Sequence, residues 1–175
     1  FLKEFQTFKN YLPHSVNNIM DIGCGLGIIN IYLNSIYKKN TNFFLLDKNR
    51  VDKKIKYGFS SNYESYNDLS ETKNLLLNNE INLDQINLFD VEKTINIKEK
   101  IDLVISLKSM GYHYPLETYL NLFKKHCSQD AIFIFDISKG NYDSISLKRI
   151  FKKVEVIYEE SSIHSLNRVC CKGIF

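Results

Sequence analysis

Three glycines, each separated from the next by one residue, stand where a short apolar run gives way to a helical pattern. The run, residues 18–22, is typical of a short buried strand. From Leu26 onwards, apolar residues recur every three or four positions, as in an amphipathic helix. Glycine has no Cβ, so Gly23, Gly25 and Gly27 allow a sharp turn and a close approach of the backbone to a ligand. This feature predicts a strand–turn–helix unit with a ligand at the turn.

Further apolar runs follow along the chain, with helical patterns between most of them. Four of these runs are expected as strands: residues 42–47, 86–89, 101–107 and 131–136. Continuous apolar strands that alternate with helices indicate a parallel sheet covered on both faces. Residues 154–158 and 169–174 are expected to close the sheet as an antiparallel pair. The fold class is therefore α/β, in a single domain over residues 1–175, which is an ordinary size for one domain.

An N-terminal helix is expected over residues 1–13, because its phenylalanines share one helical face and Pro13 ends the pattern. Further helices are expected over residues 69–79 with Asp68 or Ser70 as N-cap, from Pro115 onwards, and weakly over residues 143–151. The intervening residues 48–68 show no clear periodicity and are rich in aromatic side chains. A loop of this length is often functional, so it is either a lid over a pocket or a surface loop with aromatic anchors.

Composition excludes several functional classes. Lys and Arg number 23 against 20 Asp and Glu, and the lysines are scattered, so a nucleic-acid partner is not expected. No apolar run approaches the roughly 18–20 residues of a membrane helix, so no membrane association is expected. The four cysteines form no CxxC pair and no histidine follows at zinc spacing, so no metal site is expected. We expect reduced thiols in a cytoplasmic protein.

The acidic residues around the glycine turn indicate the kind of ligand. Asp47 ends the next strand, 47 − 25 = 22 residues beyond Gly25, and a carboxylate at about 20 residues' distance can accept hydrogen bonds from ribose hydroxyls. The third glycine of a dinucleotide fingerprint would fall at Ile28, but here it comes one residue early, at Gly27. Asp21 lies just before the turn, where it would repel a pyrophosphate and suit a cationic group. The pattern favours S-adenosylmethionine over a dinucleotide.

The run over residues 19–27 resembles motif I of the Rossmann-like, S-adenosylmethionine-dependent methyltransferases, and the order of the later strands extends the resemblance over nearly the whole chain. It implies a three-layer sandwich with a mostly parallel seven-stranded sheet and an antiparallel last strand. It also implies that Asp47 binds the ribose, that Asp90 lies near the adenine amino group, and that Ser106 ends the strand facing the transferred methyl group. The residues that this resemblance places at the cofactor are Asp21, Gly23, Cys24, Gly25, Gly27, Asp47, Lys48, Asp90, Val91 and Ser106.

Each of these roles has a structural alternative. Asp90 can cap a loop, Ser106 can form a hydrogen bond at a strand end, and Cys24 can be a small packing residue without a base to activate it. The glycines alone can form a tight turn without a ligand. The ordered set of motif I, Asp47 and the following strands favours the cofactor interpretation.

The loop after residues 101–107 is expected to face the acceptor. His113 is the candidate base, because a hydroxyl nucleophile must lose its proton and histidine titrates near neutral pH. Lys108, Tyr112 and Tyr114 are candidate substrate-binding residues, although the loop can equally be a pocket wall. Its Tyr-His-Tyr-Pro sequence resembles small-molecule and sugar O-methyltransferases, and the Asn/Asp-Pro-Pro-Tyr signature of many N-methyltransferases is absent.

These observations predict methyl transfer to a small polar acceptor, through oxygen, with S-adenosylhomocysteine (SAH) as the product. Two alternatives stay open at this stage. One is an RNA or protein methyltransferase that uses its lysines to attract the substrate. The other is a non-catalytic, methyltransferase-like binding subunit.

Overall fold

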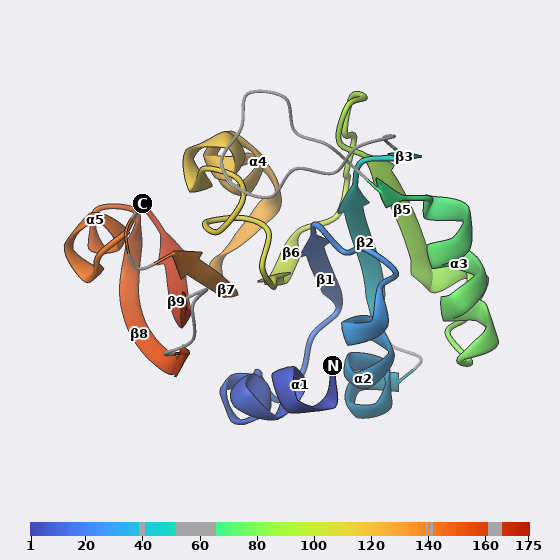
Figure 1. Ribbon diagram of the computed structural model, residues 1–175, viewed down its shortest axis with the longest axis horizontal. Helices are drawn as coiled ribbons and strands as arrows, with labels where there is room; N and C mark the ends of the chain where they lie inside the picture. Colours follow the sequence, from blue (N-terminus) through green and yellow to red (C-terminus); the bar gives the residue numbers. More distant parts are fainter. Residues whose placement is uncertain (39–40, 52–65, 139, 141, 161–165) are drawn as a thin grey trace.

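The computed structural model describes residues 1–38, 41–51, 66–138, 140, 142–160 and 166–175, and Figure 1 shows their arrangement. One seven-stranded sheet forms the centre, in the order β5-β2-β1-β6-β7-β9-β8. Its strands are β1 (Asn18–Ile22), β2 (Asn42–Asp47), β5 (Ile86–Asp90), β6 (Ile101–Ser106), β7 (Cys127–Ser138), β8 (Phe151–Glu160) and β9 (Leu166–Ile174). All run in parallel except β9, which is antiparallel to both neighbours. The predicted α/β architecture with a reversed last strand is confirmed.

Helices cover both faces of this sheet. The α-helices are α1 (Leu2–Phe8), α2 (Ile28–Tyr37), α3 (Leu69–Asn78), α4 (Leu120–His126) and α5 (Ser144–Lys148), and the short 3-10 segments are Lys9–Tyr11, Leu83–Gln85 and Leu116–Tyr119. On one face, α1, α2 and α3 bury Phe8, Leu33 and Leu76 against the sheet. On the other face, α4 and α5 contribute Phe123 and Leu147. The result is three layers with a separate apolar core on each side of the sheet.

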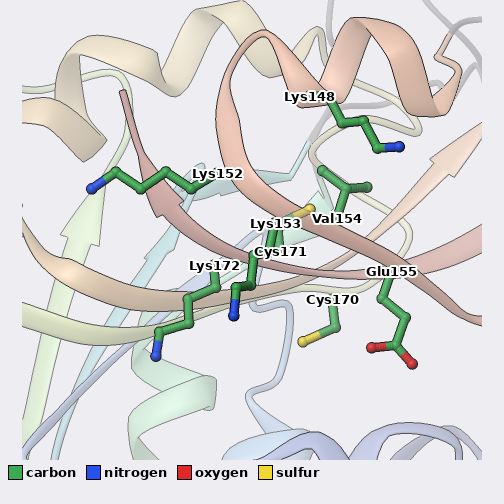
Figure 2. Close-up of a pocket in the computed structure, with 8 residues that line it drawn as sticks. All are labelled: Lys148, Lys152, Lys153, Val154, Glu155, Cys170, Cys171 and Lys172. Atoms are coloured by element: carbon green, nitrogen blue, oxygen red, sulfur yellow. The ribbon is translucent and has the colours of Figure 1, made fainter.

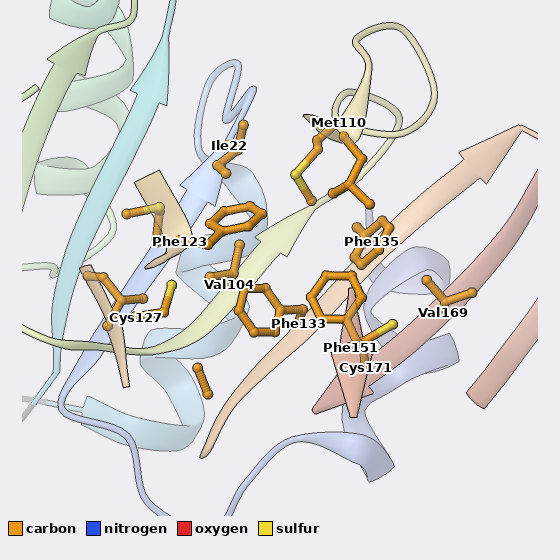
Figure 3. Packing of buried hydrophobic residues seen from close by; sticks show 14 of the residues in the cluster. Ile22, Val104, Met110, Phe123, Cys127, Phe133, Phe135, Phe151, Val169 and Cys171 are labelled. Atoms are coloured by element: carbon orange, nitrogen blue, oxygen red, sulfur yellow. The ribbon is translucent and has the colours of Figure 1, made fainter. Parts of the chain in front are cut away.

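The core beneath α4 contains the rings of Phe123, Phe133, Phe135 and Phe151 among aliphatic and sulfur-containing side chains, as Figure 3 shows. The ring of Phe133 on β7 lies 5.1 Å from that of Phe123 and 4.9 Å from that of Phe151, between ring centroids. Burying aromatic side chains of this size contributes a large part of a core's hydrophobic free energy. These rings join β7 and β8 to α4, and they fix the half of the sheet that carries the reversed strand.

Several boundaries differ from the sequence predictions. The helix expected from Pro115 begins as a 3-10 turn, and α4 proper starts at Leu120. The weak helix expected over residues 143–151 is only the five residues of α5, whose N-cap Asp143 accepts from the backbone N–H of Ser146 at 2.7 Å. Strand β7 begins at Cys127, earlier than expected, because Cys127 pairs with Ile101 of β6 before an irregularity shifts the register to Leu103 and Ile132.

The predicted loop over residues 48–68 falls partly outside the described residues, which omit 52–65. Its two ends form a short antiparallel ladder between β3 (Arg50–Val51) and β4 (Tyr66–Asn67). Asp68 is the N-cap of α3, with its side chain accepting from the Ser70 N–H at 2.8 Å. The prediction of a lid therefore stays a prediction.

The order of the strands decides where a ligand can bind. Strand β1 lies between β2 and β6. From β1, the chain first adds β2 and β5 on one side of the sheet and then β6 and β7 on the other side. In open parallel sheets, the loops at the carboxyl ends of such neighbouring strands diverge and leave a crevice. The glycine turn after β1 and the acidic end of β2 both lie at this edge.

Candidate functional site

The glycine turn connects β1 to α2 through a backbone that only glycine adopts easily. Gly23, Gly25 and Gly27 have φ angles of +69°, +52° and +71°. The N–H of Gly23 donates to the carbonyl of Leu46 at 2.7 Å, which ties the turn to β2. A Cβ on Gly23 would lie 2.0 Å from the Ser109 hydroxyl, whereas a Cβ on Gly25 would meet nothing within 4 Å. The turn is thus closed on one side and open on the other.

Asp47 binds the backbone of the glycine turn on its open side, at Gly25. Its carboxylate accepts from the Gly25 N–H and from its neighbour Lys48 N–H, each at 2.7 Å. Burial raises the pKa of this carboxyl, and these two backbone hydrogen bonds oppose the rise. The Asn67 side chain and the Lys48 charge also favour the charged form. A carboxylate offers about four acceptor positions, so capacity remains for a ligand's hydroxyl group. From the other side, Asn67 and Thr72 donate to the Gly25 carbonyl at 3.1 and 2.8 Å.

Asp21 lies beneath the same turn, on the face of the sheet covered by α2. The residue is only 5% exposed, and its carboxylate accepts from the side-chain amide of Asn30 at 2.6 Å. Burial and, to a smaller extent, the nearby charge of Asp47 raise the pKa of Asp21 to about 7, although the hydrogen bond from Asn30 opposes the rise. Burial also raises the pKa of Cys24 well above its usual value, with the two carboxylates adding to the effect. Cys24 is therefore a thiol at neutral pH, in agreement with the packing alternative.

The third acidic residue lies at the end of β5, in register with Asp47. The carboxylate of Asp90 accepts from the Glu92 N–H at 3.0 Å and lies 3.5 Å from the Lys93 ammonium. These contacts match the loop-capping alternative, and the adenine role stays a prediction. The adjacent Val91 donates its N–H to the Asp47 carbonyl at 3.0 Å.

Lys48, another predicted cofactor residue, is 8% exposed, and its ammonium lies 3.7 Å from Glu92. Arg50 also pairs with Glu92. Lys48 thus contributes its backbone N–H to Asp47 and its side chain to this ion-pair cluster. A direct contact of the Lys48 side chain with a cofactor remains a prediction.

Comparisons with known proteins give the fold a name. No protein-family model matches the sequence, and a comparison with curated proteins finds no match. Solved structures do match. The ribosomal protein L11 methylase of Lactobacillus delbrueckii subsp. bulgaricus has a TM-score of 0.64 at 14% identity, covering 97% of this chain and 76% of that one. The N-methyltransferase NodS of Bradyrhizobium japonicum has a TM-score of 0.59 at 10% identity, covering 98% of this chain and 93% of that one.

The chain has the fold of the class I, S-adenosylmethionine-dependent methyltransferases. Coclaurine N-methyltransferase, solved with N-methylheliamine and SAH, also matches, with a TM-score of 0.51 at 15% identity over 78% of this chain and 35% of that one. The acceptors named for these neighbours differ, so the methyltransferase fold here leaves the acceptor open.

The residues of the turn fit the cofactor of this methyltransferase fold. S-adenosylmethionine carries an ammonium, a ribose and a sulfonium, and two acidic side chains flank the turn. The position where a Cβ of Gly25 would lie is open, which leaves room beside the Asp47 carboxylate. Asp21, Gly25 and Asp47 are therefore brought together as the sequence predicts.

The expected substrate loop packs directly against the glycine turn. Ser106, at the end of β6, is fully buried, and its hydroxyl donates to the Ile22 carbonyl at 2.8 Å and accepts from the Met110 N–H at 2.9 Å. These bonds join the carboxyl ends of β1 and β6, as the strand-end alternative expects. The next serine, Ser109, touches the turn at Gly23 and was missed by the sequence analysis.

Residues 109–114 form a compact turn around one carbonyl group. The backbone N–H groups of Tyr112, His113 and Tyr114 all donate to the Ser109 carbonyl, at 3.1, 2.7 and 3.1 Å. Gly111 has φ +79°, and a Cβ there would lie 2.8 Å from the Asp136 carbonyl. The His113 side chain is half-buried, and its ring stands nearly perpendicular to that of Tyr112 with centroids 4.7 Å apart. The turn holds these aromatic groups at the carboxyl end of β6.

Lys108 does not extend along this loop towards the glycine turn. Its ammonium lies 3.2 Å from Glu4 on α1, and its backbone N–H donates to the Asp136 carboxylate at 3.0 Å. The adjacent charge of Glu4 raises the pKa of Lys108, although burial opposes the rise. Substrate binding by Lys108 stays a prediction. In the structure, its ammonium forms an ion pair with Glu4 of the N-terminal helix.

A buried arginine completes this side of the molecule. Arg168 on β9 is fully buried, and its guanidinium donates to Asp136 through Nε at 2.7 Å and Nη2 at 2.9 Å. It also donates to Glu4, through Nη2 to the side chain at 2.7 Å and through Nη1 to the carbonyl at 3.1 Å, and to the Thr7 hydroxyl. All five of its N–H groups thus have an acceptor. The only sequence signal for this network is Asp136 at the end of a buried strand.

A cavity of about 510 Å³ lies elsewhere, on the β8–β9 pair, and Figure 2 shows its lining. Lys152 and Lys153 stand at the start of β8, and β8 runs in the same direction as β7. The cavity is therefore at the amino ends of the strands, opposite the glycine turn. In the described part of the chain, no helix is long and apolar enough to span a membrane.

Proposed function

We propose that the protein transfers a methyl group from S-adenosylmethionine to an oxygen of a small polar acceptor. The observation that carries the proposal is the 2.7 Å hydrogen bond between the Asp47 carboxylate and the Gly25 N–H at the carboxyl ends of β1 and β2. It brings an acidic group beside an open glycine turn, within the methyltransferase fold. The cofactor would supply a methyl group activated by a positively charged sulfur.

The protein's own residues divide the work of binding. The Asp47 carboxylate would accept hydrogen bonds from the ribose hydroxyls, and Asp21 would provide negative charge for the ammonium. Asp90 lies at the next strand end, where it would approach the adenine. Methyl transfer is an in-line displacement, so the remaining task is to align the acceptor with the reacting carbon and to exclude water.

His113 is the proposed base on the acceptor side. The turn at residues 109–114 packs against the glycine turn through Ser109, so the His113 loop borders the proposed cofactor site. A hydroxyl acceptor must lose its proton as the new bond forms, and a neutral imidazole can take it. Tyr112 and Tyr114 flank His113 and would line the acceptor site. The three backbone hydrogen bonds to the Ser109 carbonyl hold this turn in one conformation. His113 would therefore help to position the acceptor as well as take its proton.

Thermal unfolding tests the cofactor part of the proposal. A ligand that binds only the folded state stabilises it by about 2.7 kcal/mol at a hundredfold excess over its Kd. S-adenosylmethionine and SAH should both raise the Tm, and NAD should not. A Tm that rises with NAD and does not change with S-adenosylmethionine or SAH would overturn the proposal.

Transfer itself is tested with labelled S-adenosylmethionine and a panel of sugars, phenols, small amines, RNA and protein. Labelling of a hydroxyl compound supports the proposal. Labelling of RNA with a steep dependence on salt supports an RNA methyltransferase instead, because phosphate contacts release counterions. SAH binding without labelling of any acceptor supports a binding subunit.

His113→Ala tests the base assignment once an acceptor is known. Loss of a general base should lower kcat by roughly 10²–10⁴-fold and leave the affinity for SAH unchanged. His14→Ala is the matched control, because His14 is exposed on another part of the surface. Full kcat in His113→Ala would remove the base and leave a reaction that depends on alignment alone.

A further inference from the structure

Asn30 is a polar residue in an apolar position. It lies on the sheet-facing side of α2 next to Ile29, and its side chain is completely buried. Its backbone N–H donates to the Gly27 carbonyl at 2.9 Å, which places it in the first turn after the glycines. Its side-chain amide donates to Asp21 at 2.6 Å. Burying an amide in a core costs free energy unless its groups are bonded, so this position calls for an explanation.

The bonding of Asn30 is incomplete. Its amide N–H reaches Asp21, but its side-chain Oδ1 is buried without a hydrogen-bond partner among the described residues. An unsatisfied buried acceptor typically costs about 1–3 kcal/mol. A residue chosen for stability alone would be apolar here, as Ile29 and Leu33 are on the same face. The bond to Asp21 is the one hydrogen bond of the Asn30 side chain among the described residues.

The other groups around Asp21 make its negative charge unfavourable. On the neighbouring strands, its register partners are Leu45 on β2 and Ile105 on β6, both fully buried and apolar. The ionisable groups facing it are Asp47 at the end of β2, which is acidic, and the Cys24 thiol on the turn. Within the described ranges, no lysine or arginine pairs with it. The Asn30 amide is the one described side chain that stabilises the charged form.

We infer that Asn30 is a positioning residue. Its amide fixes the Asp21 carboxylate beneath the glycine turn and keeps it charged for the cationic end of the cofactor. This inference rests on the proposed function. Burial favours the neutral acid, and a hydrogen bond donated to the carboxylate favours the charged form. With the amide in place, the two effects leave the pKa of Asp21 near neutrality, at about 7. Without it, burial and Asp47 act unopposed, and the pKa rises further.

The test is the affinity for SAH between pH 5.5 and 8.5, measured by calorimetry on the wild-type chain and on Asn30→Leu. Leucine has nearly the same volume and suits an apolar helix face. The wild-type affinity should fall as the pH drops below about 7, and the variant should show the same fall at a higher pH. A rise of one pKa unit weakens binding about fivefold at pH 7 and about tenfold well below it, with recovery towards pH 8.5.

A second ligand separates the charge effect from a general disturbance of the site. 5′-Methylthioadenosine has the adenosine and the sulfur of SAH but no ammonium. Its affinity should depend little on pH and should be the same for both chains. Equal weakening of both ligands at every pH in Asn30→Leu would overturn the inference, because it would mean that Asn30 only maintains the fold of the site.

Asn34→Leu is the matched control. Asn34 lies one turn further along α2, also has a buried Oδ1 without a partner among the described residues, and has no bond to Asp21. Its substitution should leave the pH profile unchanged. Asp21→Asn should flatten the profile for SAH, since it removes the titrating group.

The outcomes distinguish the inference from the proposed function. No SAH binding by the wild-type chain at any pH refutes the proposed function. SAH binding with the same pH midpoint in the wild type and in Asn30→Leu refutes the inference alone. If Asn30→Leu does not fold, Asn30→Ser removes the amide with less bulk, and the same midpoint comparison applies to it.

Discussion

Asp21 and Asp136 are both buried acids in the carboxyl halves of central strands, yet their surroundings are opposite. Asp136 has no exposed surface and faces the Arg168 guanidinium through two hydrogen bonds, with a third from the Lys108 N–H. Asp21 has one amide and no described cation beside it. The first carboxylate is paired with a cation within the protein, whereas the second has the role of pairing with a ligand's cation in the proposed function. If the proposed function holds, a buried charge without a cationic partner is a better indicator of a ligand site than burial itself.

The largest expected effect comes from removing the cation of the satisfied pair. Arg168→Met should lower the free energy of unfolding by about 3–5 kcal/mol, because Asp136 keeps a buried charge without a partner. Urea unfolding measures this loss. Lys172→Met is the control on the same strand, since Lys172 is half-exposed and lies 4.0 Å from Asp130, and it should change stability by less than about 0.5 kcal/mol.

A double variant distinguishes the effect of the unpaired charge from the effect of the changed side-chain shape. Asp136→Leu combined with Arg168→Met leaves no unpaired charge at this position, so it should be more stable than Arg168→Met alone. A double variant as unstable as the single one would mean that shape, and not charge, dominates this cluster.

The opposite result is expected for Asp21. Its pKa is about 7 in the folded protein and 3.8 in an ordinary setting, so between these values the folded state holds a proton that the unfolded state has released. The free energy of unfolding therefore falls as the pH rises from about 4 to 7. Asp21→Asn should stabilise the ligand-free protein at pH 8 by about 1–4 kcal/mol, since one pKa unit corresponds to about 1.4 kcal/mol.

Urea unfolding at pH 4 and pH 8 checks this prediction, with the gain confined to the higher pH. Asp130→Asn, at a side chain that is 91% exposed, is the control and should show no such gain. Equal free energies of unfolding for the wild type and Asp21→Asn at pH 8 would mean that other groups stabilise the charged Asp21 carboxylate. Asp21 would then not differ from Asp136 in this respect.

Asp47 is expected to show a smaller effect, on binding. Asp47→Ala removes an acceptor for the ribose hydroxyls, and loss of a hydrogen bond to a charged group costs about 1.5–3 kcal/mol. Calorimetry with SAH measures the loss. Asp130→Ala is the control, because the Asp130 side chain is 91% exposed, and it should leave the affinity for SAH unchanged. Unchanged affinity in Asp47→Ala would remove Asp47 from the site.

The smallest effect concerns the open side of the turn. Gly25 has φ +52°, so Gly25→Ala should cost about 1–2 kcal/mol of stability from the left-handed backbone alone. Its new methyl group would also occupy the space beside Asp47 and weaken SAH binding. Gly140→Ala is the control, because a Cβ there also meets nothing within 4 Å and no left-handed φ is involved. Full SAH affinity in Gly25→Ala would place the ligand elsewhere.

The sequence predicts the parts of this molecule that depend on local pattern. The glycine turn, the strand ends at Asp21 and Asp47, and the reversed last strand follow from periodicity, spacing and resemblance. Contacts between distant segments do not follow, because no periodicity specifies which side chain meets which across the sheet. Ser109 against Gly23 and Arg168 against Asp136 are such contacts. Asn30 did leave a signal, as an amide within an apolar helical stripe.

The reach of Arg168 has a consequence for the order of assembly. Its bonds to Glu4 join residues 164 positions apart, and β9 lies in the sheet between β7 and the earlier-synthesised β8. During synthesis, β8 has no partner strand until β9 has been made, and α1 has no guanidinium to bind. Contacts of such long sequence separation form late, because the chain must first close a large loop. The apolar contacts of α1 with α2 can form earlier, but its hydrogen bonds to Arg168 form only after β9 has left the ribosome.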